Sequence, residues 1–140
     1  MKNEIQADLV IADFPCNPDE ITRELGVQPR RTWLEGEPVT PGLSMKRKSN
    51  GWVLSSGLDK QASFEEHVKA LLEKINPNIE RFALVCTRYH AELSCAVYIY
   101  YNNEESTPWL GFDKEQTKAL GDIGIAVDFD LYVLPGEDNG

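Results

Sequence analysis

Apolar and polar residues alternate in three segments of the chain, and alternation of this kind predicts β-strands. The segments are residues 4–14, 92–101 and 125–133. Inward-facing positions in the last two include Val97, Ile99, Phe129 and Leu131. Because a slip of one residue turns every side chain to the opposite face of a sheet, the burial of Phe129 tests the expected register.

Capping signals predict helices between these strands. Asn17 is an expected N-cap, Pro18 fits the first helical position, and Gly26 is an expected stop. Ser63 and Glu66 have the spacing of a capping box and open the helix SFEEHVKALLEKI. Both helices carry apolar residues on one face, so both are expected to pack on a sheet.

Two further helices are predicted with different support. Asp113 is expected to cap a short helix, DKEQTKAL, that ends at Gly121. Residues 78–89 are interpreted as a helix, although 82–87 also fit a strand. A short extended piece is expected at 31–34 and a strand at 52–55. The predicted helices and strands therefore alternate along the chain, and no group of helices follows the last strand.

The order of elements and the length predict the architecture. With 140 residues, the whole chain 1–140 is expected to be a single domain. The pattern predicts an α+β fold with a single, mainly antiparallel sheet and helices packed on one face, in a ferredoxin-like variant. Residues 35–50 are expected to form a long basic loop, and 134–140 a frayed tail.

The charge narrows the functions that fit. The formal net charge of −9 argues against a whole-surface nucleic-acid binder and against charge-driven binding to anionic lipid. No apolar run reaches the roughly 20 residues of a membrane span, and the acids in MKNEIQADLVIADF argue against a signal peptide. Three cysteines without CxxC spacing predict reduced thiols, no metal site and a cytoplasmic location.

Several segments together resemble a known family. They are PDEITRELGVQP, RRTWLEGE, SNGWVLSSG, ELSCAVYIY and GIAVDFDLYVL. They are similar to the bacterial domain-of-unknown-function family 4279, from about Ile5 to Val133. The resemblance implies a compact bacterial cytoplasmic domain and, through members that neighbour toxin systems, an immunity role.

Candidate catalytic residues find little support in the sequence. His90-Ala91-Glu92 has the H-x-E spacing of zinc deaminases, but the P-C-x-x-C that supplies the other ligands is missing. Cys16 precedes a helix N-terminus, a position that can lower a thiol pKa, but it has no evident partner. His67 is expected on the surface. We therefore predict no catalytic residue and no cofactor, with an enzyme of unrecognised site as an open alternative.

The long loop carries the first candidate binding site. Its basic and aromatic residues are Arg30, Arg31, Trp33, Lys46, Arg47, Lys48 and Trp52. Guanidinium groups beside aromatic rings suit a small anion or a nucleotide. In the alternative interpretation, Trp33 and Trp52 pack on each other and the lysines only solvate the loop.

The last third of the chain carries the second candidate. Residues 92–140 hold ten acidic and two basic residues, a net charge of −8. Aromatic residues and acids that could contact a partner are Tyr98, Tyr100, Glu104, Glu105 and Trp109. A one-signed patch speeds encounter with an oppositely charged partner, and aromatic side chains serve as anchors. We therefore favour a non-enzymatic protein-binding module, immunity- or antitoxin-like, with a basic protein partner; the alternative is that the charge serves solubility alone.

Overall fold

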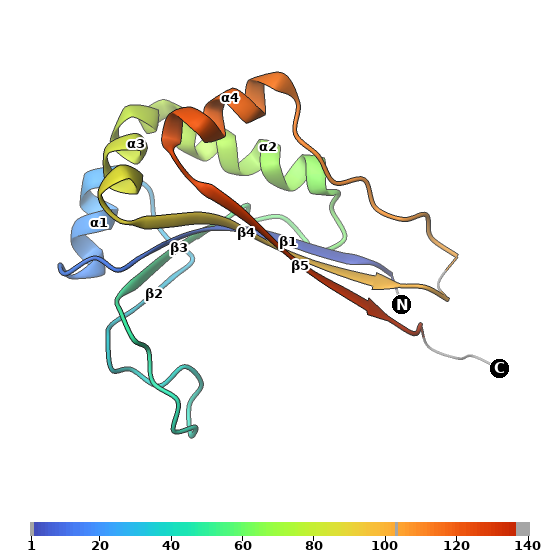
Figure 1. Cartoon of the computed structure of the whole chain (residues 1–140), viewed down its shortest axis with the longest axis horizontal. Helices are drawn as coiled ribbons and strands as arrows, with labels where there is room; N and C mark the ends of the chain where they lie inside the picture. Colours follow the sequence, from blue (N-terminus) through green and yellow to red (C-terminus); the bar gives the residue numbers. More distant parts are fainter. Residues whose placement is uncertain (1, 103, 137–140) are drawn as a thin grey trace.

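The computed structural model describes residues 2–102 and 104–136 (Figure 1). Its strands are β1 (Glu4–Ala12), β2 (Arg31–Trp33), β3 (Gly51–Ser55), β4 (His90–Tyr100) and β5 (Ala126–Leu134). Its helices are α1 (Pro18–Leu25), α2 (Phe64–Ile75), the short 3-10 helix η1 (Asn76–Asn78), α3 (Ile79–Arg88) and α4 (Lys114–Ile123). The segment 79–88 is therefore a helix, as favoured from the sequence.

The strands form one mixed sheet in the order β2-β3-β1-β4-β5. The β2–β3, β3–β1 and β1–β4 pairs are antiparallel, and β4–β5 is parallel. The helices cover one face, and the chain between β2 and β3 projects away from the helices (Figure 1). The predicted α+β class, with a mainly antiparallel sheet and helices on one face, is confirmed.

The chain can be divided into a first unit from β1 to β4 and a C-terminal unit, α4–β5, that extends the sheet. From β1 to β4 the chain follows the order β-α-β-β-α-β of a split βαβ arrangement, with α3 inserted before β4. The unit α4–β5 then extends the sheet beyond β4. The ferredoxin-like detail stays a prediction, because the sheet order alone does not establish that relationship.

The core lies between the sheet and the helices. Leu9, Trp52 and Cys95 point into it from three neighbouring strands, and Phe64 and Phe82 meet them from the helices. The indole N–H of Trp52 donates a hydrogen bond to Thr22 Oγ1 at 2.9 Å, so its polar atom is satisfied inside the core. In the described residues, the buried apolar side chains form one continuous cluster between the sheet and the helices.

The predicted helix starts are confirmed, and one predicted end is wrong. The Asn17 side chain accepts from the Asp19 N–H, and the capping box of Ser63 and Glu66 is formed. The last helix does not stop at Gly121 but continues to Gly124, which takes the left-handed conformation at φ 81°. Only this second glycine supplies the geometry that ends a helix.

Of the four positions expected to be buried in the strands, only Val97 is buried, because Ile99 is half-buried and the other two are exposed. Val97 is fully buried, but Phe129 is 37% exposed and Leu131 56%. The register is nevertheless as expected, because Phe129 pairs with Cys95, and its ring lies 5.7 Å from the buried ring of Phe64. The exposure arises because β5 is the edge strand, where the helix layer covers little.

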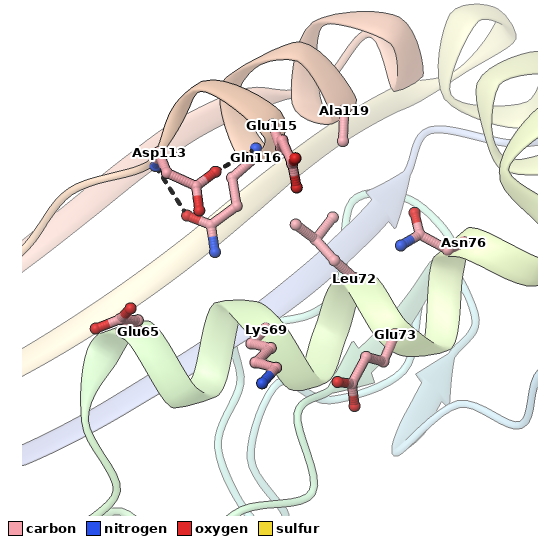
Figure 2. Close-up of a pocket in the computed structure, with 9 residues that line it drawn as sticks. All are labelled: Glu65, Lys69, Leu72, Glu73, Asn76, Asp113, Glu115, Gln116 and Ala119. Carbon is pink, nitrogen blue, oxygen red and sulfur yellow. Dashed lines mark hydrogen bonds between the residues drawn. The ribbon is translucent and has the colours of Figure 1, made fainter.

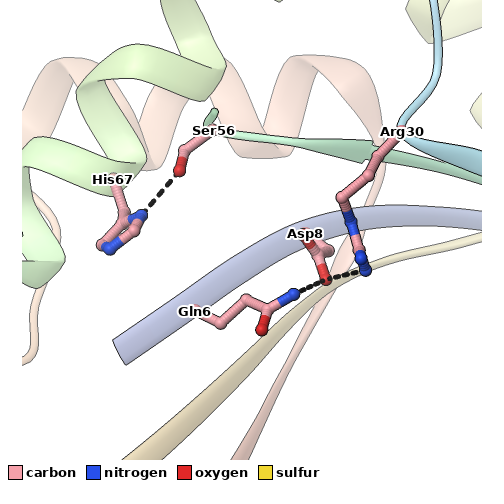
Figure 3. A network of polar contacts seen from close by, with 5 residues as sticks. All are labelled: Gln6, Asp8, Arg30, Ser56 and His67. Carbon is pink, nitrogen blue, oxygen red and sulfur yellow. Dashed lines mark hydrogen bonds and ion pairs between the residues drawn. The ribbon is translucent and has the colours of Figure 1, made fainter. Parts of the chain in front are cut away.

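His67 is another correction, since it is 1% exposed rather than on the surface. Its Nδ1 lies 2.6 Å from Ser56 Oγ at the end of β3 (Figure 3). The Ser56 hydroxyl also accepts from the Leu58 N–H. Burial lowers the pKa of His67, which favours its neutral form. The hydrogen bond between His67 and Ser56 therefore joins α2 to the end of β3 without a buried charge.

The remaining expectations concern the thiols, the membrane and the chain end. Cys16, Cys86 and Cys95 are free. Among the described residues, no helix has the length and apolar character to cross a membrane. Of the predicted frayed tail 134–140, residue 134 belongs to β5 and residues 137–140 lie outside the described residues.

Candidate functional site

The most exposed strand of the molecule is β5. All nine residues from Ala126 to Leu134 are exposed. In the described part of the chain, β5 pairs with β4 on one side and with no strand on the other. Its unpaired backbone groups can therefore accept a further strand. We call residues 126–134 the β5 edge.

The two faces of the β5 edge differ in chemistry. The face on the helix side carries Val127, Phe129, Leu131 and Val133. The opposite face carries Asp128, Asp130 and Tyr132, which pair with residues 94, 96 and 98 of β4. The ring of Tyr132 stacks on Tyr98 at 4.8 Å with an angle of 12° between the planes. An incoming strand would thus meet an apolar row on one face and two carboxylates on the other.

An aromatic cluster continues the apolar face toward the loop after β4. Phe64 lies between Phe112 and Phe129, with ring centroids 5.6 and 5.7 Å away. A small pocket of about 170 Å³ opens beside Phe64, and Trp109 and Pro108 line it. Trp109 is 61% exposed, so its ring is available as an anchor next to this pocket.

The residues expected from the sequence to bind a partner differ in their exposure to solvent. Trp109, Glu104 and Glu105 are exposed, and Tyr98 is half-buried within its stack. Tyr100 is only 8% exposed, and its backbone N–H donates to Asn3 Oδ1. Tyr100 therefore lacks the exposed ring that an anchor needs. Sequence reasoning missed the apolar face of the β5 edge, because alternation does not tell an edge strand from a central one.

The basic loop forms an ordered hairpin. Pro38 and Lys46 form a bridge, and Arg47 exchanges backbone hydrogen bonds with Gly36 and Glu37. The Asn50 side chain ties its base to the carbonyls of residues 14 and 16. The hairpin lies on the side of the sheet that the helices leave uncovered (Figure 1).

Trp33 is the centre of this hairpin's base. Its indole N–H donates to the Ser49 carbonyl at 3.1 Å. Its ring lies so close to Gly51 that a Cβ there would be 2.0 Å from it. The guanidinium carbon of Arg47 is 4.0 Å from the ring centroid, and that of Arg31 is 5.3 Å away. We call Arg31, Trp33 and Arg47 the arginine–tryptophan cluster.

The other residues expected at the basic site lie elsewhere or have partners. Trp52 is fully buried on the helix side and does not pack on Trp33, because the partner of Trp52 in β2 is Thr32. Arg30 donates to Asp8 Oδ2 at 3.2 Å, and the Gln6 side-chain amide donates to the same oxygen at 3.0 Å (Figure 3). Lys46 and Lys48 are exposed on the hairpin. Residue spacing alone does not indicate which arginine side chain contacts Trp33.

A groove of about 490 Å³ runs between α2 and α4 (Figure 2). Its charged and capping residues are Glu65, Lys69, Glu73, Asp113, Glu115 and Gln116. Asp113 and Gln116 bond each other's backbone N–H groups in a capping box, so their presence in the groove is explained by the helix start. The groove adds negative potential to the helix side without a residue that specifies a ligand.

Among the candidates, the nucleophiles are either buried or not activated. Ser56 and His67 form a hydroxyl–imidazole contact, but both are buried, so a substrate cannot reach them. The pKa of Cys16 is raised, by burial and by Glu20, although its position before a helix N-terminus is one that can lower it. His90 and Glu92 lie 3.5 Å apart at the start of β4. In the part of the chain that the structure describes, no three metal-ligating side chains gather.

Comparison with known families agrees with the resemblance seen in the sequence. A family model described as Domain of unknown function (DUF4279) matches residues 3–134. The chain belongs to this family. No curated protein and no solved structure gives a significant match. The match covers both the β5 edge and the arginine–tryptophan cluster, so both lie within the family's domain.

Proposed function

We propose that this DUF4279 domain is a protein-binding module that receives an extended segment of a basic partner along the β5 edge. The observation that carries the proposal is the nine-residue exposed strand with an unpaired side. Strand addition gives affinity through backbone hydrogen bonds and specificity through alternate side chains. Proteins normally shorten, charge or cover the edge strands of their sheets, so a long exposed edge strand with an apolar face suggests that another chain pairs with it.

The charges favour a basic partner over a second copy of the chain. In an antiparallel pairing of two copies, the register that pairs all nine residues is centred on residue 130 and opposes Asp130 to itself. The register centred on residue 129 opposes Asp128 to Asp130, and the register centred on residue 131 avoids such contacts but leaves both carboxylates without a favourable partner. Like charges directly opposite destabilise a strand pair. A partner with Lys or Arg at alternate positions meets the same carboxylates favourably. Its intervening apolar residues would cover Phe129 and Leu131.

Residues beyond the strand would assist this contact. Trp109 offers an exposed ring beside the pocket at Phe64. Glu104 and Glu105 are exposed in the loop after β4, where they would steer a basic partner during encounter. In its most specific form the proposal is an immunity- or antitoxin-like role, in which the partner is a basic toxin.

Designed peptides test the proposal on the full chain. A peptide that alternates Lys and Val should bind, with an affinity that falls as salt rises. Asp130→Lys and Leu131→Lys should each weaken binding by about tenfold, while Glu80→Lys on the exposed face of α3 should leave it almost unchanged. Calorimetry measures all four proteins, and circular dichroism confirms that each variant is folded.

Two peptide controls separate strand addition from charge alone. A peptide with Glu in place of Lys should not bind, and a basic peptide with a central Pro should bind much more weakly, because Pro cannot complete a strand pair. Equal binding of the Pro peptide would exclude strand addition. Equal loss in Glu80→Lys and Asp130→Lys would exclude the β5 edge as the site.

A further inference from the structure

The arginine–tryptophan cluster, at the opposite edge of the sheet from β5, places two guanidinium groups against one aromatic ring. The Arg47 and Arg31 guanidinium carbons both lie within 5.3 Å of one ring centroid. The pKa of Arg31 is lowered, first by partial removal from water and then by the neighbouring charges of Arg30 and Arg47. Within the described residues, neither Arg31 nor Arg47 has an ion-pair partner, whereas Arg30 has Asp8.

The cluster is also built rather than loosely attached. Trp33 is fixed by its hydrogen bond to the Ser49 carbonyl and by its contact with Gly51. Arg47 is fixed through its backbone, since its N–H donates to Glu37 and its carbonyl accepts from Gly36. A site held by backbone pairing needs little ordering when a ligand arrives.

One polar atom in this cluster lacks a partner. Arg47 Nε is buried and has no hydrogen-bond partner in the described structure. A buried donor without an acceptor is costly. Because Nε is buried, an oxyanion would be held by the terminal Nη groups of Arg47, which lie in the guanidinium plane beside the Trp33 ring. The stacking thus orients Arg47 without using its donors.

We propose that the arginine–tryptophan cluster binds a phosphate group, with Arg47 as the principal donor and Arg31 as the second. Two guanidiniums match the charge and the bidentate geometry of a phosphate. The site does not extend to a nucleobase, because Gly51 and Arg47 already contact the Trp33 ring and Trp52 is buried in the core. This inference is independent of the β5 edge and goes beyond the proposed partner binding.

Titration of the full chain with inorganic phosphate at low salt tests the assignment. Phosphate should bind, more weakly as ionic strength rises. Arg47→Gln should weaken binding by about tenfold or more, and Arg47→Lys should restore only part of it, because an ammonium lacks the planar fork. Lys48→Gln is the matched control, since it removes one exposed charge from the same hairpin and should change the affinity less than about twofold.

The source of the phosphate is decided by three probes. A phosphomonoester of a small alcohol, a nucleoside monophosphate and a phosphoserine peptide are titrated beside inorganic phosphate. Similar affinity for all four supports a site that reads the phosphate group alone, whereas tenfold preference for the nucleotide would overturn the absence of a base subsite. Absence of binding by all four at low salt, or equal losses in Arg47→Gln and Lys48→Gln, would overturn the site itself.

Discussion

The two edges of the sheet are built in opposite ways. β2 has three residues, carries arginine, and continues into a hairpin that is ordered by its own hydrogen bonds. β5 has nine residues, all exposed, with an apolar row on one face. Short strands, cations and covering loops are the means by which proteins protect sheet edges. The β2 edge is short and carries a cation, whereas β5 is long and uncovered and has charges only at Asp128 and Asp130, so the β5 edge is the one suited to receive another chain.

The edges also differ in charge, and the distance between them keeps them independent. Three strands separate β2 from β5, which puts the edges about 19 Å apart at the usual strand spacing. That is more than twice the screening length of roughly 8 Å at physiological salt. A basic ligand at one edge and an anion at the other would therefore bind without strong electrostatic coupling.

The largest contrast is expected between the interior and the β5 edge. Trp52→Ala should lower the free energy of unfolding by about 3–5 kcal/mol, because it empties a fully buried site and removes the bond to Thr22. Phe129→Ala should cost only about 1–2 kcal/mol, since its ring is already 37% exposed. Denaturant unfolding of both variants measures the difference. Equal losses would mean that β5 is as well buried as β3.

A pair of glycine substitutions tests the protection of the β2 edge. Gly51→Ala places a Cβ against the Trp33 ring and should cost about 1–3 kcal/mol. Gly121→Ala on α4 meets no atom within 4 Å and should stabilise the protein by about 0.5–1 kcal/mol through helix propensity. Thermal unfolding gives both signs. A neutral Gly51→Ala would show that Trp33 moves aside freely and that the hairpin is not fixed.

A pH effect is expected on the β3 side of the molecule. The pKa of His67 is lowered in the folded state, so the unfolded chain binds the proton more readily. Stability is therefore fully present above the unfolded-state pKa, near 6.5, and is lost as pH falls toward the folded-state value. Unfolding measured between pH 7.5 and 5 should show this loss in the natural protein and in His90→Gln. The loss should shrink in His67→Leu; an unchanged loss would assign the acid sensitivity to carboxylates instead.

The smallest expected effect concerns the loop after β4. Glu104→Lys should change stability by less than about 0.5 kcal/mol, because Glu104 is exposed. The same change should slow association with the Lys–Val peptide while leaving dissociation nearly constant, since a peripheral charge acts on encounter. Stopped-flow mixing at low salt separates the two rates. An effect confined to dissociation would place Glu104 inside the contact rather than beside it.

Local signals in the sequence predicted the elements well, because caps and alternation are written in neighbouring residues. His67 could also have been placed, since it lies three residues after Phe64 and four before Leu71 on the buried stripe. The position of β5 could not, because exposure of Phe129 depends on the strand order. The arginine–tryptophan cluster was equally hidden, as the contact of Arg47 with Trp33 depends on how the hairpin folds back.

The pairing of β5 with β4 alone also has a consequence for local unfolding of the protein. The unit α4–β5 is the last described part of the chain, and its only neighbour in the sheet is β4. Its opening would leave β1 to β4 paired, so it can separate as a cooperative segment below the cost of global unfolding. Amide hydrogens of β5 should accordingly exchange faster than those facing β1 in β4. A bound partner strand would slow that exchange, so the exchange rates of the β5 amides would show directly whether a partner is bound.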